Sequence, residues 1–359
     1  MNFFSLSLPA QQALRRIGFN AEMQRAAFAA AEPDAMPWRV IEQQRSHWTV
    51  SDGMRSAHAP VTSGWAERLA VGDWVLAEPA PDQRVTLVAQ LAPFSSLERA
   101  TAHGRQVLVR NVDLALLVMG LDRDFNPRRI ERYLALAAGG GATPVVVLTK
   151  RDVAADVDAK VERLRARLPR STPIVAVNAT DAAAAREFDG WLTEASTAVL
   201  LGSSGAGKST LTNTLAGAPM QATAAVRADD SRGRHTTRAR TLIPLPGGAC
   251  VIDTPGLRAL ALAVEKHDLD AAFGDIAELA EGCRFRDCTH HGEPGCAVRD
   301  HIDADRLTNY HKLAREAQRQ QAKDSEDPNA IVRFEAGQKA KWKAIHKSVR
   351  AFNKANRGN

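Results

Sequence analysis

The chain has 359 residues, of which 45% are hydrophobic and 25% are charged, and its formal net charge is +6. This length predicts two or three domains, and the apolar fraction is high enough for each to have a core. No apolar run is long enough to cross a bilayer, and the first residues lack the layout of a signal peptide. The sequence therefore predicts a soluble cytoplasmic protein, and its positive charge favours a polyanionic partner.

The first two segments differ in composition and in their pattern of apolar residues. Residues 1–39 are rich in alanine and predict a helical extension. Residues 40–105 contain short alternating apolar runs separated by Gly, Pro and Asp, which is typical of a small β-barrel. Three tryptophans fall in this segment, and we expect them in its core rather than stacked on RNA bases: Trp48, Trp65 and Trp74.

Residues 106–264 alternate between apolar strands and amphipathic helices, which predicts a parallel α/β sheet. Residues 107–120 form one long strand or a pair of strands, and residues 127–141 read as a helix with a glycine stop. A second amphipathic helix is expected over residues 153–168. Residues 265–359 are polar and helical, with a Cys/His cluster and a basic tail.

A phosphate-binding loop occupies residues 202–210, with the sequence GSSGAGKST. It matches G-x-x-x-x-G-K-[ST] and lies between a predicted strand and a predicted helix, as the motif requires. Its glycines let backbone N–H groups surround phosphate oxygens, and the helix N-terminus adds a favourable dipole. Lys208 is expected at the β- and γ-phosphates and Ser209 at Mg²⁺. The alternative, a Gly/Ser loop that matches by chance, is not favoured because both flanking elements are present.

Two further segments are typical of a nucleoside triphosphatase. Asp253 ends an apolar strand and opens DTPG, so its carboxylate is expected near Mg²⁺, with the Gly256 N–H at the γ-phosphate. The alternative is an ordinary turn. The GRHTTR segment, residues 233–238, contains Thr236 and Thr237, and we expect Thr237 to bind Mg²⁺ when the γ-phosphate is present. The alternative here is a solvated polar loop.

A guanine-binding loop is predicted at residues 149–152, TKRD, directly after the strand PVVVL. Asp152 can accept two hydrogen bonds from guanine that adenine does not offer, and the Lys150 stem would lie over the base. Thr149 stands where Asn is commoner. The alternative role for Asp152 is the N-cap of the following helix. The NAT segment, residues 178–180, follows the next strand and is expected to offer a backbone N–H to guanine.

These motifs form the familiar GTPase set in a cyclically shifted order, because the guanine-binding loop precedes the phosphate loop. A sheet tolerates such a shift when the original termini lie close together. The order, the GRHTT loop and the C-x4-C-x-H-x5-C cluster resemble the circularly permuted GTPases that depend on the small ribosomal subunit. The segments NVD (residues 111–113), DFNPRRIERYL (residues 124–134) and EPGCAV (residues 293–298) are similar too.

The resemblance covers roughly residues 40–315, and it implies more than the motifs do on their own. It implies an N-terminal OB-fold barrel that binds RNA, a circularly permuted P-loop GTPase and a C-terminal helical zinc-binding domain. It also implies that the protein, expected to be a monomer, assists late maturation of the small (30S) ribosomal subunit. GTP hydrolysis would then be stimulated by that subunit and its rRNA.

The Cys/His cluster predicts one structural zinc ion. Three cysteines with one histidine make a closed tetrahedral ligand set, which leaves no position for catalytic water. His291 is the neighbouring candidate for the histidine ligand, and the family spacing favours His290. Cys250 lies in an apolar strand and is expected to be a buried small side chain. The predicted zinc ligands are Cys283, Cys288, His290 and Cys296.

The residue after DTPG, where a GTPase usually orients water, is Leu257. Slow intrinsic turnover is therefore expected, with ribosome binding supplying the missing groups. His235 is a candidate for positioning the water; the alternative is a histidine packed on the surface. The predicted catalytic residues are Lys208, His235, Thr237, Asp253 and Gly256. The predicted GTP/GDP contacts are Thr149, Lys150, Arg151, Asp152, Asn178, Ala179, Gly202, Ser203, Ser204, Gly205, Ala206, Gly207, Lys208, Ser209 and Thr210.

The basic tail, residues 339–359, is expected to contact RNA phosphates, although a solvated charged face is the simpler alternative. Two other functions fit parts of the sequence. One is a GTP-dependent RNA-binding checkpoint with incidental hydrolysis, and the other is an ATP-dependent nucleic-acid enzyme that uses the phosphate loop alone. Asp152 disfavours the second of these.

Overall fold

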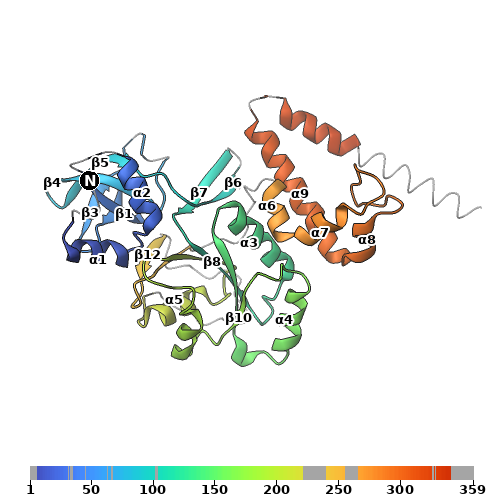
Figure 1. Ribbon diagram of the computed structural model, residues 1–359, viewed down its shortest axis with the longest axis horizontal. Helices are drawn as coiled ribbons and strands as arrows, with labels where there is room; N and C mark the ends of the chain where they lie inside the picture. Colours follow the sequence, from blue (N-terminus) through green and yellow to red (C-terminus); the bar gives the residue numbers. More distant parts are fainter. Residues whose placement is uncertain are drawn as a thin grey trace, which may run out of the picture.

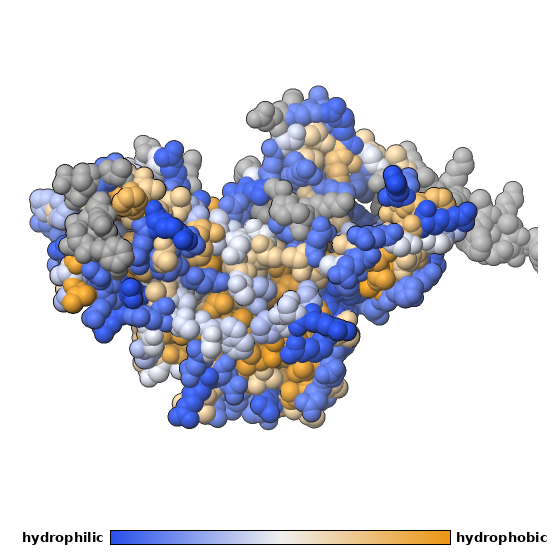
Figure 2. All heavy atoms as spheres, viewed as in Figure 1, coloured by the Kyte–Doolittle hydropathy of each residue, from blue (hydrophilic) through white to orange (hydrophobic). Residues whose placement is uncertain are grey.

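The computed structural model describes residues 6–340, with the exception of 31, 33–34, 45, 63, 66–67, 102–103, 221–239, 255–265, 326 and 328. Three parts follow one another across the molecule: a barrel, a central α/β region and a helical region (Figure 1). Hydrophilic side chains cover most of the visible face (Figure 2). Within the described residues, every helix is too short or too polar to span a bilayer.

The N-terminal part is a closed barrel with two helices against it. Its strands follow the order β1-β2-β3-β5-β4, and β4 returns to pair with β1, so this order closes the sheet on itself and confirms the predicted barrel. Its first strand begins at Met36, ahead of the predicted start at residue 40. The elements are α1 (Leu8–Arg16), α2 (Ala21–Ala29), β1 (Met36–Gln43), β2 (His47–Ser51), β3 (Ser56–Pro60), β4 (Trp74–Ala80) and β5 (Arg84–Gln90).

The barrel tryptophans are core residues. Trp48 and Trp74 are fully buried, and Trp65 packs partly buried against the barrel core. Trp74 also makes an edge-to-face contact with Phe19, which fixes the N-terminal helices to the barrel wall. The expectation of a core role is confirmed for Trp48 and Trp74, and neither has a ring face left for RNA.

The central region is a mixed sheet with the order β10-β9-β8-β11-β13-β12, in which only β12 runs antiparallel to its neighbour. Residues 107–120 form two strands, because Asn111 adopts a left-handed conformation between them. The hairpin of β6 and β7 lies across the predicted boundary at residue 105. The strands are β6 (Ser96–Thr101), β7 (Gly104–Arg110), β8 (Leu114–Gly120), β9 (Thr143–Thr149), β10 (Ile174–Ala176), β11 (Thr197–Gly202), β12 (Thr241–Pro244) and β13 (Cys250–Asp253).

Both faces of this sheet are covered. Successive side chains of β8 alternate between two cores: Leu116 faces the core that contains α5, whereas Leu117 faces the core that contains α3. The helix α3 begins after Asn126, whose side chain accepts a hydrogen bond from the Arg129 N–H. The helices are α3 (Pro127–Gly139), α4 (Val157–Arg165) and α5 (Lys208–Ala216), with 3₁₀ turns η2 (Arg151–Val153) and η3 (Ala182–Phe188).

A buried arginine joins the barrel to the central sheet. Arg39 of β1 donates hydrogen bonds to the Thr197 hydroxyl at 2.8 Å and to the Asn111 carbonyl at 2.9 Å. Asp113 accepts the Thr197 N–H at 2.7 Å. Pairing of β1 with β12 makes the two parts one continuous 11-stranded sheet. The NVD segment, which the sequence offered without a role, therefore serves this junction.

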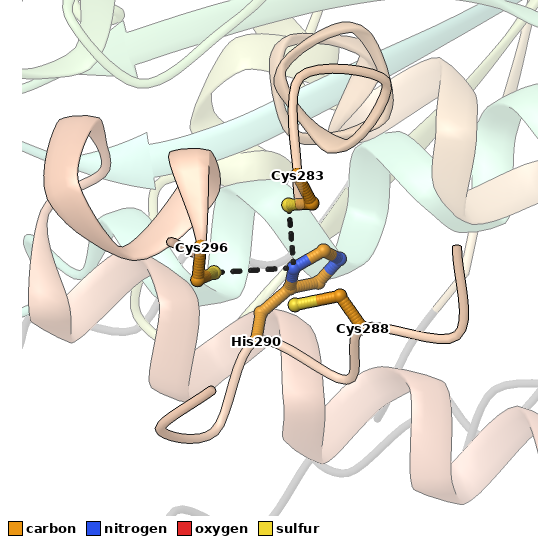
Figure 3. Close-up of side chains that lie close together, drawn as sticks. All are labelled: Cys283, Cys288, His290 and Cys296. Atoms are coloured by element: carbon orange, nitrogen blue, oxygen red, sulfur yellow. Dashed lines mark hydrogen bonds between the residues drawn. The ribbon is translucent and has the colours of Figure 1, made fainter. Parts of the chain in front are cut away.

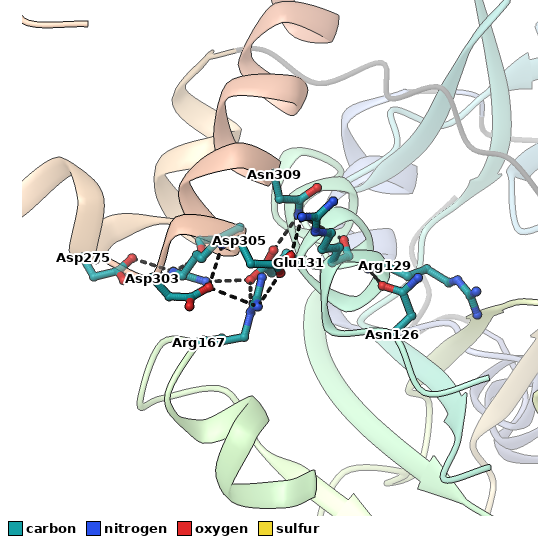
Figure 4. A network of polar contacts seen from close by, with 11 residues as sticks. Asn126, Arg129, Glu131, Arg167, Asp275, Asp303, Asp305 and Asn309 are labelled. Atoms are coloured by element: carbon teal, nitrogen blue, oxygen red, sulfur yellow. Dashed lines mark hydrogen bonds and ion pairs between the residues drawn. The ribbon is translucent and has the colours of Figure 1, made fainter. Parts of the chain in front are cut away.

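A second polar network joins the central region to the helical region (Figure 4). Glu131 of α3 is fully buried and accepts hydrogen bonds from Arg167 at 2.7 Å and from Arg306 at 3.0 Å. Arg306 also pairs with Asp275 at 2.6 Å, and Asn309 donates to Glu131. The helices of this region are α6 (Lys266–Ala272), α7 (Gly274–Ala280), α8 (Ala297–His301) and α9 (Ala304–Asp324).

We predict that Glu131→Leu destabilises the protein, because it leaves two buried guanidinium groups without their shared carboxylate. Breaking a buried ion pair from one side costs roughly 3–5 kcal/mol in the free energy of unfolding. Chemical denaturation followed by circular dichroism measures this loss. The control is Arg128→Gln, whose exposed pair with Asp305 is worth about 0–1 kcal/mol. Equal denaturation midpoints for the two variants would contradict the prediction.

Candidate nucleotide site and metal centre

The phosphate loop lies between β11 and α5, as its motif requires. Gly207 has a φ of 92° and ends the loop, and α5 begins at Lys208 with no side chain capping its N-terminus. A Cβ on Gly202 would lie 2.4 Å from the Val118 carbonyl oxygen, so the strand pairing requires glycine there. Ser204 and Gly205 are exposed, whereas Ser209 and Thr210 are half-buried at the start of α5.

Lys208 is already held in the loop. Its side chain is buried, and Nζ donates hydrogen bonds to the carbonyl oxygens of Gly202 at 2.8 Å and Ser203 at 2.7 Å. These two hydrogen bonds fix the ammonium on the inner side of the loop. Such fixed donors are what binding of a nucleotide phosphate requires.

The guanine-binding loop contacts the phosphate loop directly. The buried Thr149 hydroxyl donates a 2.6 Å hydrogen bond to the Ala206 carbonyl oxygen. Lys150 then takes a left-handed conformation, with φ 62°, and turns the chain into η2. Thr149 therefore joins the two loops through its hydroxyl group, at a position where asparagine is the commoner residue.

Asp152 does not cap the following helix. That helix, α4, begins at Val157 with Asp156 at its N-cap position, so the capping alternative is wrong. Asp152 lies within η2, where its side chain is exposed, and its carboxylate has no hydrogen-bond partner among the described residues. It is therefore available to an external group, and Arg151 beside it is exposed as well.

The NAT segment lies beside the same loop. The Val177 N–H donates to Leu148, and the Arg151 N–H donates to the Val177 carbonyl. Asn178 accepts hydrogen bonds from the backbone N–H and hydroxyl of Thr180, at 3.0 and 2.7 Å. The Ala179 carbonyl accepts from Thr214 of α5 at 2.6 Å, which ties this segment to the helix of the phosphate loop.

Asp253 lies at the same edge of the sheet, because β13 pairs in parallel with β11 in the register Leu200↔Asp253. Burial raises the pKa of its carboxyl group, and the nearby Lys208 opposes that shift. Its Oδ1 is buried and has no hydrogen-bond partner among the described residues. A buried carboxylate oxygen of this kind fits a role toward hydrated Mg²⁺. His235, Thr237 and Gly256 lie outside the described residues.

The Cys/His cluster forms in three dimensions as predicted (Figure 3). The ligand atoms of Cys283, Cys288, His290 and Cys296 all lie within 4.8 Å of one another. His290 Nδ1 lies 3.6 Å from the Cys283 sulfur and 3.5 Å from the Cys296 sulfur. Tetrahedral zinc, with Zn–S about 2.3 Å and Zn–N about 2.05 Å, places S and N roughly 3.6 Å apart. The cluster therefore has the geometry of a zinc site.

The surroundings of His290 agree with this geometry. Burial lowers the pKa of His290, which favours the neutral imidazole that a metal needs. His291, the alternative ligand, instead stacks on His311 with ring centroids 3.9 Å apart. Glu293 accepts hydrogen bonds from the backbone N–H groups of Thr289, His291 and Gly292, so it fixes the loop that carries His290.

Comparison with known proteins shows where this architecture belongs. A family model described as RsgA GTPase matches residues 92–263. The small ribosomal subunit biogenesis GTPase RsgA of Xanthomonas axonopodis pv. citri (strain 306) is 49% identical over 309 residues, which cover 81% of this chain and 83% of that protein. The chain belongs to the RsgA GTPase family. It is accordingly a hydrolase that acts on GTP, and the two alternative functions are not favoured.

Two solved structures share the fold. YjeQ from Thermotoga maritima aligns with a TM-score of 0.59 at 24% identity, covering 79% of this chain and 98% of that one. YloQ, described as a circularly permuted GTPase, aligns with a TM-score of 0.56 at 22% identity over 80% of this chain and 96% of that one. The permuted order of the GTPase motifs, predicted from the sequence, is confirmed.

The sequence motifs missed one group of contacts around the candidate nucleotide site. Asp122, Asp124 and Arg129 contact the guanine-binding and phosphate loops from the segment after β8. Asp124 and Arg129 fall in the DFNPRRIERYL segment, which carried the family resemblance but no assigned role.

We predict that the purified protein contains one zinc ion and that Cys288→Ser loses it, because a hydroxyl is a much weaker zinc ligand than a thiolate. Metal analysis of the protein after dialysis measures the zinc content. Cys250→Ser is the matched control, because this buried cysteine lies in β13 and is not one of the four residues of the cluster. The prediction fails if the Cys288 variant keeps its zinc or if both variants lose it.

Proposed function

We propose that this protein hydrolyses GTP to GDP and phosphate on the small (30S) ribosomal subunit and thereby assists late maturation of that subunit. The relatives named small ribosomal subunit biogenesis GTPase RsgA support the partner, and the basic net charge is consistent with binding rRNA. The main structural support for the nucleotide site is the hydrogen bond between Thr149 and Ala206, which joins the guanine-binding loop to the phosphate loop. The protein acts in the cytoplasm as a monomer.

Each residue has a proposed role in the reaction. Lys208 neutralises charge at the β- and γ-phosphates, and Asp152 selects guanine. Ser209 and Thr237 bind Mg²⁺, and Asp253 acts on it through water. The ion supplies charge neutralisation between the phosphates. The Gly256 N–H faces the γ-phosphate, and His235 positions the attacking water.

The zinc ion has a structural role in this proposal. The closed set of ligands leaves no place for substrate, and the cluster holds together the loop between α7 and α8. The barrel and the basic tail, residues 339–359, provide contacts to rRNA phosphates. Tail residues beyond 340 lie outside the described residues, so this role rests on the sequence.

We predict that Asp152→Ala weakens GTP binding by on the order of a hundredfold or more, because two charge-assisted hydrogen bonds to the base are lost. Binding of ATP is expected to stay weak and unchanged. Equilibrium titration with both nucleotides measures this selectivity. Asp158→Ala, an exposed acidic residue of α4, is the control for the loss of charge. Unaltered GTP affinity in the Asp152 variant would remove the guanine-binding role.

We predict slow phosphate release from GTP that rises strongly when purified small subunits are added, with ATP inert in both conditions. A catalytic group completed by a partner adds roughly 10³–10⁵ in rate. His235→Ala is expected to lose most of this stimulation. GTP turnover that does not respond to subunits would refute the proposed partner. Hydrolysis would be incidental if a Lys208→Ala variant that cannot turn over GTP still supported maturation of the subunit.

A further inference from the structure

The segment between β8 and α3, residues 121–126, contacts both the guanine-binding loop and the phosphate loop. The Leu121 N–H donates to the Thr149 carbonyl at 3.0 Å, and Lys160 of α4 donates to the Leu121 carbonyl at 2.6 Å. Lys160 also lies over the ring of Phe125, 5.7 Å from its centroid. These contacts fix the backbone of this segment against the guanine-binding loop.

On the guanine side, Asp122 pairs with Lys150 at 2.7 Å. Partial burial raises the pKa of the Asp122 carboxyl group, but the hydrogen bonds from Lys150 and from the Asp124 N–H, together with the charge of Lys150, outweigh burial and leave the pKa below its ordinary value. This pair fixes the ammonium of Lys150 against the segment that follows β8.

On the side of the phosphate loop, the ion pair of Asp124 and Arg129 hydrogen-bonds to the hydroxyl of Ser203. That hydroxyl lies 2.7 Å from both carboxylate oxygens of Asp124, to which it donates. Arg129 of α3 pairs with Asp124 and donates to the same hydroxyl oxygen at 2.8 Å. The carbonyl oxygen of Ser203 in turn accepts the hydrogen bond from Lys208. One residue therefore connects the ion pair behind the loop to the lysine inside it.

Arg129 lies apart from the network that joins α3 to the helical region. Figure 4 shows Arg129 and Asn126 at one side of α3, away from Glu131 and its partners. The adjacent Arg128 instead reaches Asp305 of α9. These two neighbouring arginines of α3 therefore make different contacts. Arg128 pairs with α9, whereas Arg129 contacts the phosphate loop.

We propose that Arg129 and Asp124 are positioning residues that hold the phosphate loop, through Ser203, in the conformation that binds nucleotide. The proposal rests on the GTPase function proposed above. Exposed loop residues such as Ser204 and Gly205 lose conformational freedom when a ligand orders them, and a loop that is ordered in advance avoids this cost. Because the ion pair acts behind the loop, it contributes equally to GTP, GDP and transition-state binding.

The test is a double-mutant cycle on Arg129→Gln and Ser203→Ala, with GTP and GDP affinities measured in the absence of ribosomal subunits. We expect Arg129→Gln to weaken both nucleotides by about tenfold, as for one charge-assisted hydrogen bond. The double variant should bind no more weakly than Arg129→Gln alone, because both changes break the same contact. Arg128→Gln is the matched control and should bind as the unchanged protein does.

Kinetics separate positioning from catalysis. With subunits present, Arg129→Gln should raise KM and leave kcat nearly unchanged, since it removes uniform binding. A fall in kcat with unaltered GDP affinity would instead make Arg129 a transition-state group and overturn the proposal. Additive losses in the double-mutant cycle would overturn it too. If Arg129→Gln does not fold, Asp124→Asn, which removes the charge that Arg129 pairs with, replaces it, and affinity equal to the unchanged protein would count against the proposal.

Failure of this inference is distinguishable from failure of the proposed function. If the unchanged protein does not bind GTP, the proposed function fails. If the unchanged protein binds GTP and every Arg129 and Ser203 variant binds it equally well, the function stands and the positioning role is refuted.

Discussion

The parallel alignment of β9, β8, β11 and β13 is the constraint on which the nucleotide site depends. Parallel strands end at one edge of a sheet, so the loops that follow them meet there whatever their order along the chain. The guanine-binding loop follows β9, the phosphate loop follows β11 and the Asp253 segment ends β13. Circular permutation changes how the strands are connected and leaves this edge intact. Because β8 lies between β9 and β11 in the sheet, the segment that follows it lies between the guanine-binding and phosphate loops.

The helix α3 connects this edge of the sheet to the helical region. Its first turn contacts the phosphate loop through Arg129, and its next turn carries Glu131 into the buried network with Arg306 of α9. Apolar side chains follow the same route, because Leu134 of α3 and Phe273, just after α6, belong to one continuous core. The helical region is therefore built onto the central region and shares its core.

Sequence patterns predicted what is encoded locally. The glycines and lysine of the phosphate loop, and the spacing of Cys283, Cys288, His290 and Cys296, are each contained in one short segment. The burial of Trp48 and Trp74 also follows from an alternating apolar pattern. Such features depend on chain geometry over a few residues, and tertiary packing does not alter them.

Contacts between distant segments could not be predicted in this way. Asp124 meets Ser203 only because β8 and β11 are neighbours in the sheet, although the two residues are far apart in the sequence. The start of α4 at Val157 was missed for a related reason. Val153, the first residue of the predicted helix, instead ends the 3₁₀ turn η2, which follows the left-handed Lys150. The hydrogen bond from the Arg151 N–H to the Val177 carbonyl holds this turn beside the residue that follows β10.

The two polar contacts of α3, through Arg129 and through Glu131, differ in what they allow. Rotation of α3 against α9 would break the hydrogen bonds of a fully buried carboxylate, at a cost of several kcal/mol. Typical coupling free energies between sites are only about 1–3 kcal/mol, too small to drive that change. The buried network thus joins the central and helical regions more strongly than a coupling free energy of that size could overcome. An ion pair that holds the phosphate loop to α3 fits this arrangement, because it places the lysine of that loop on the rigid part of the molecule.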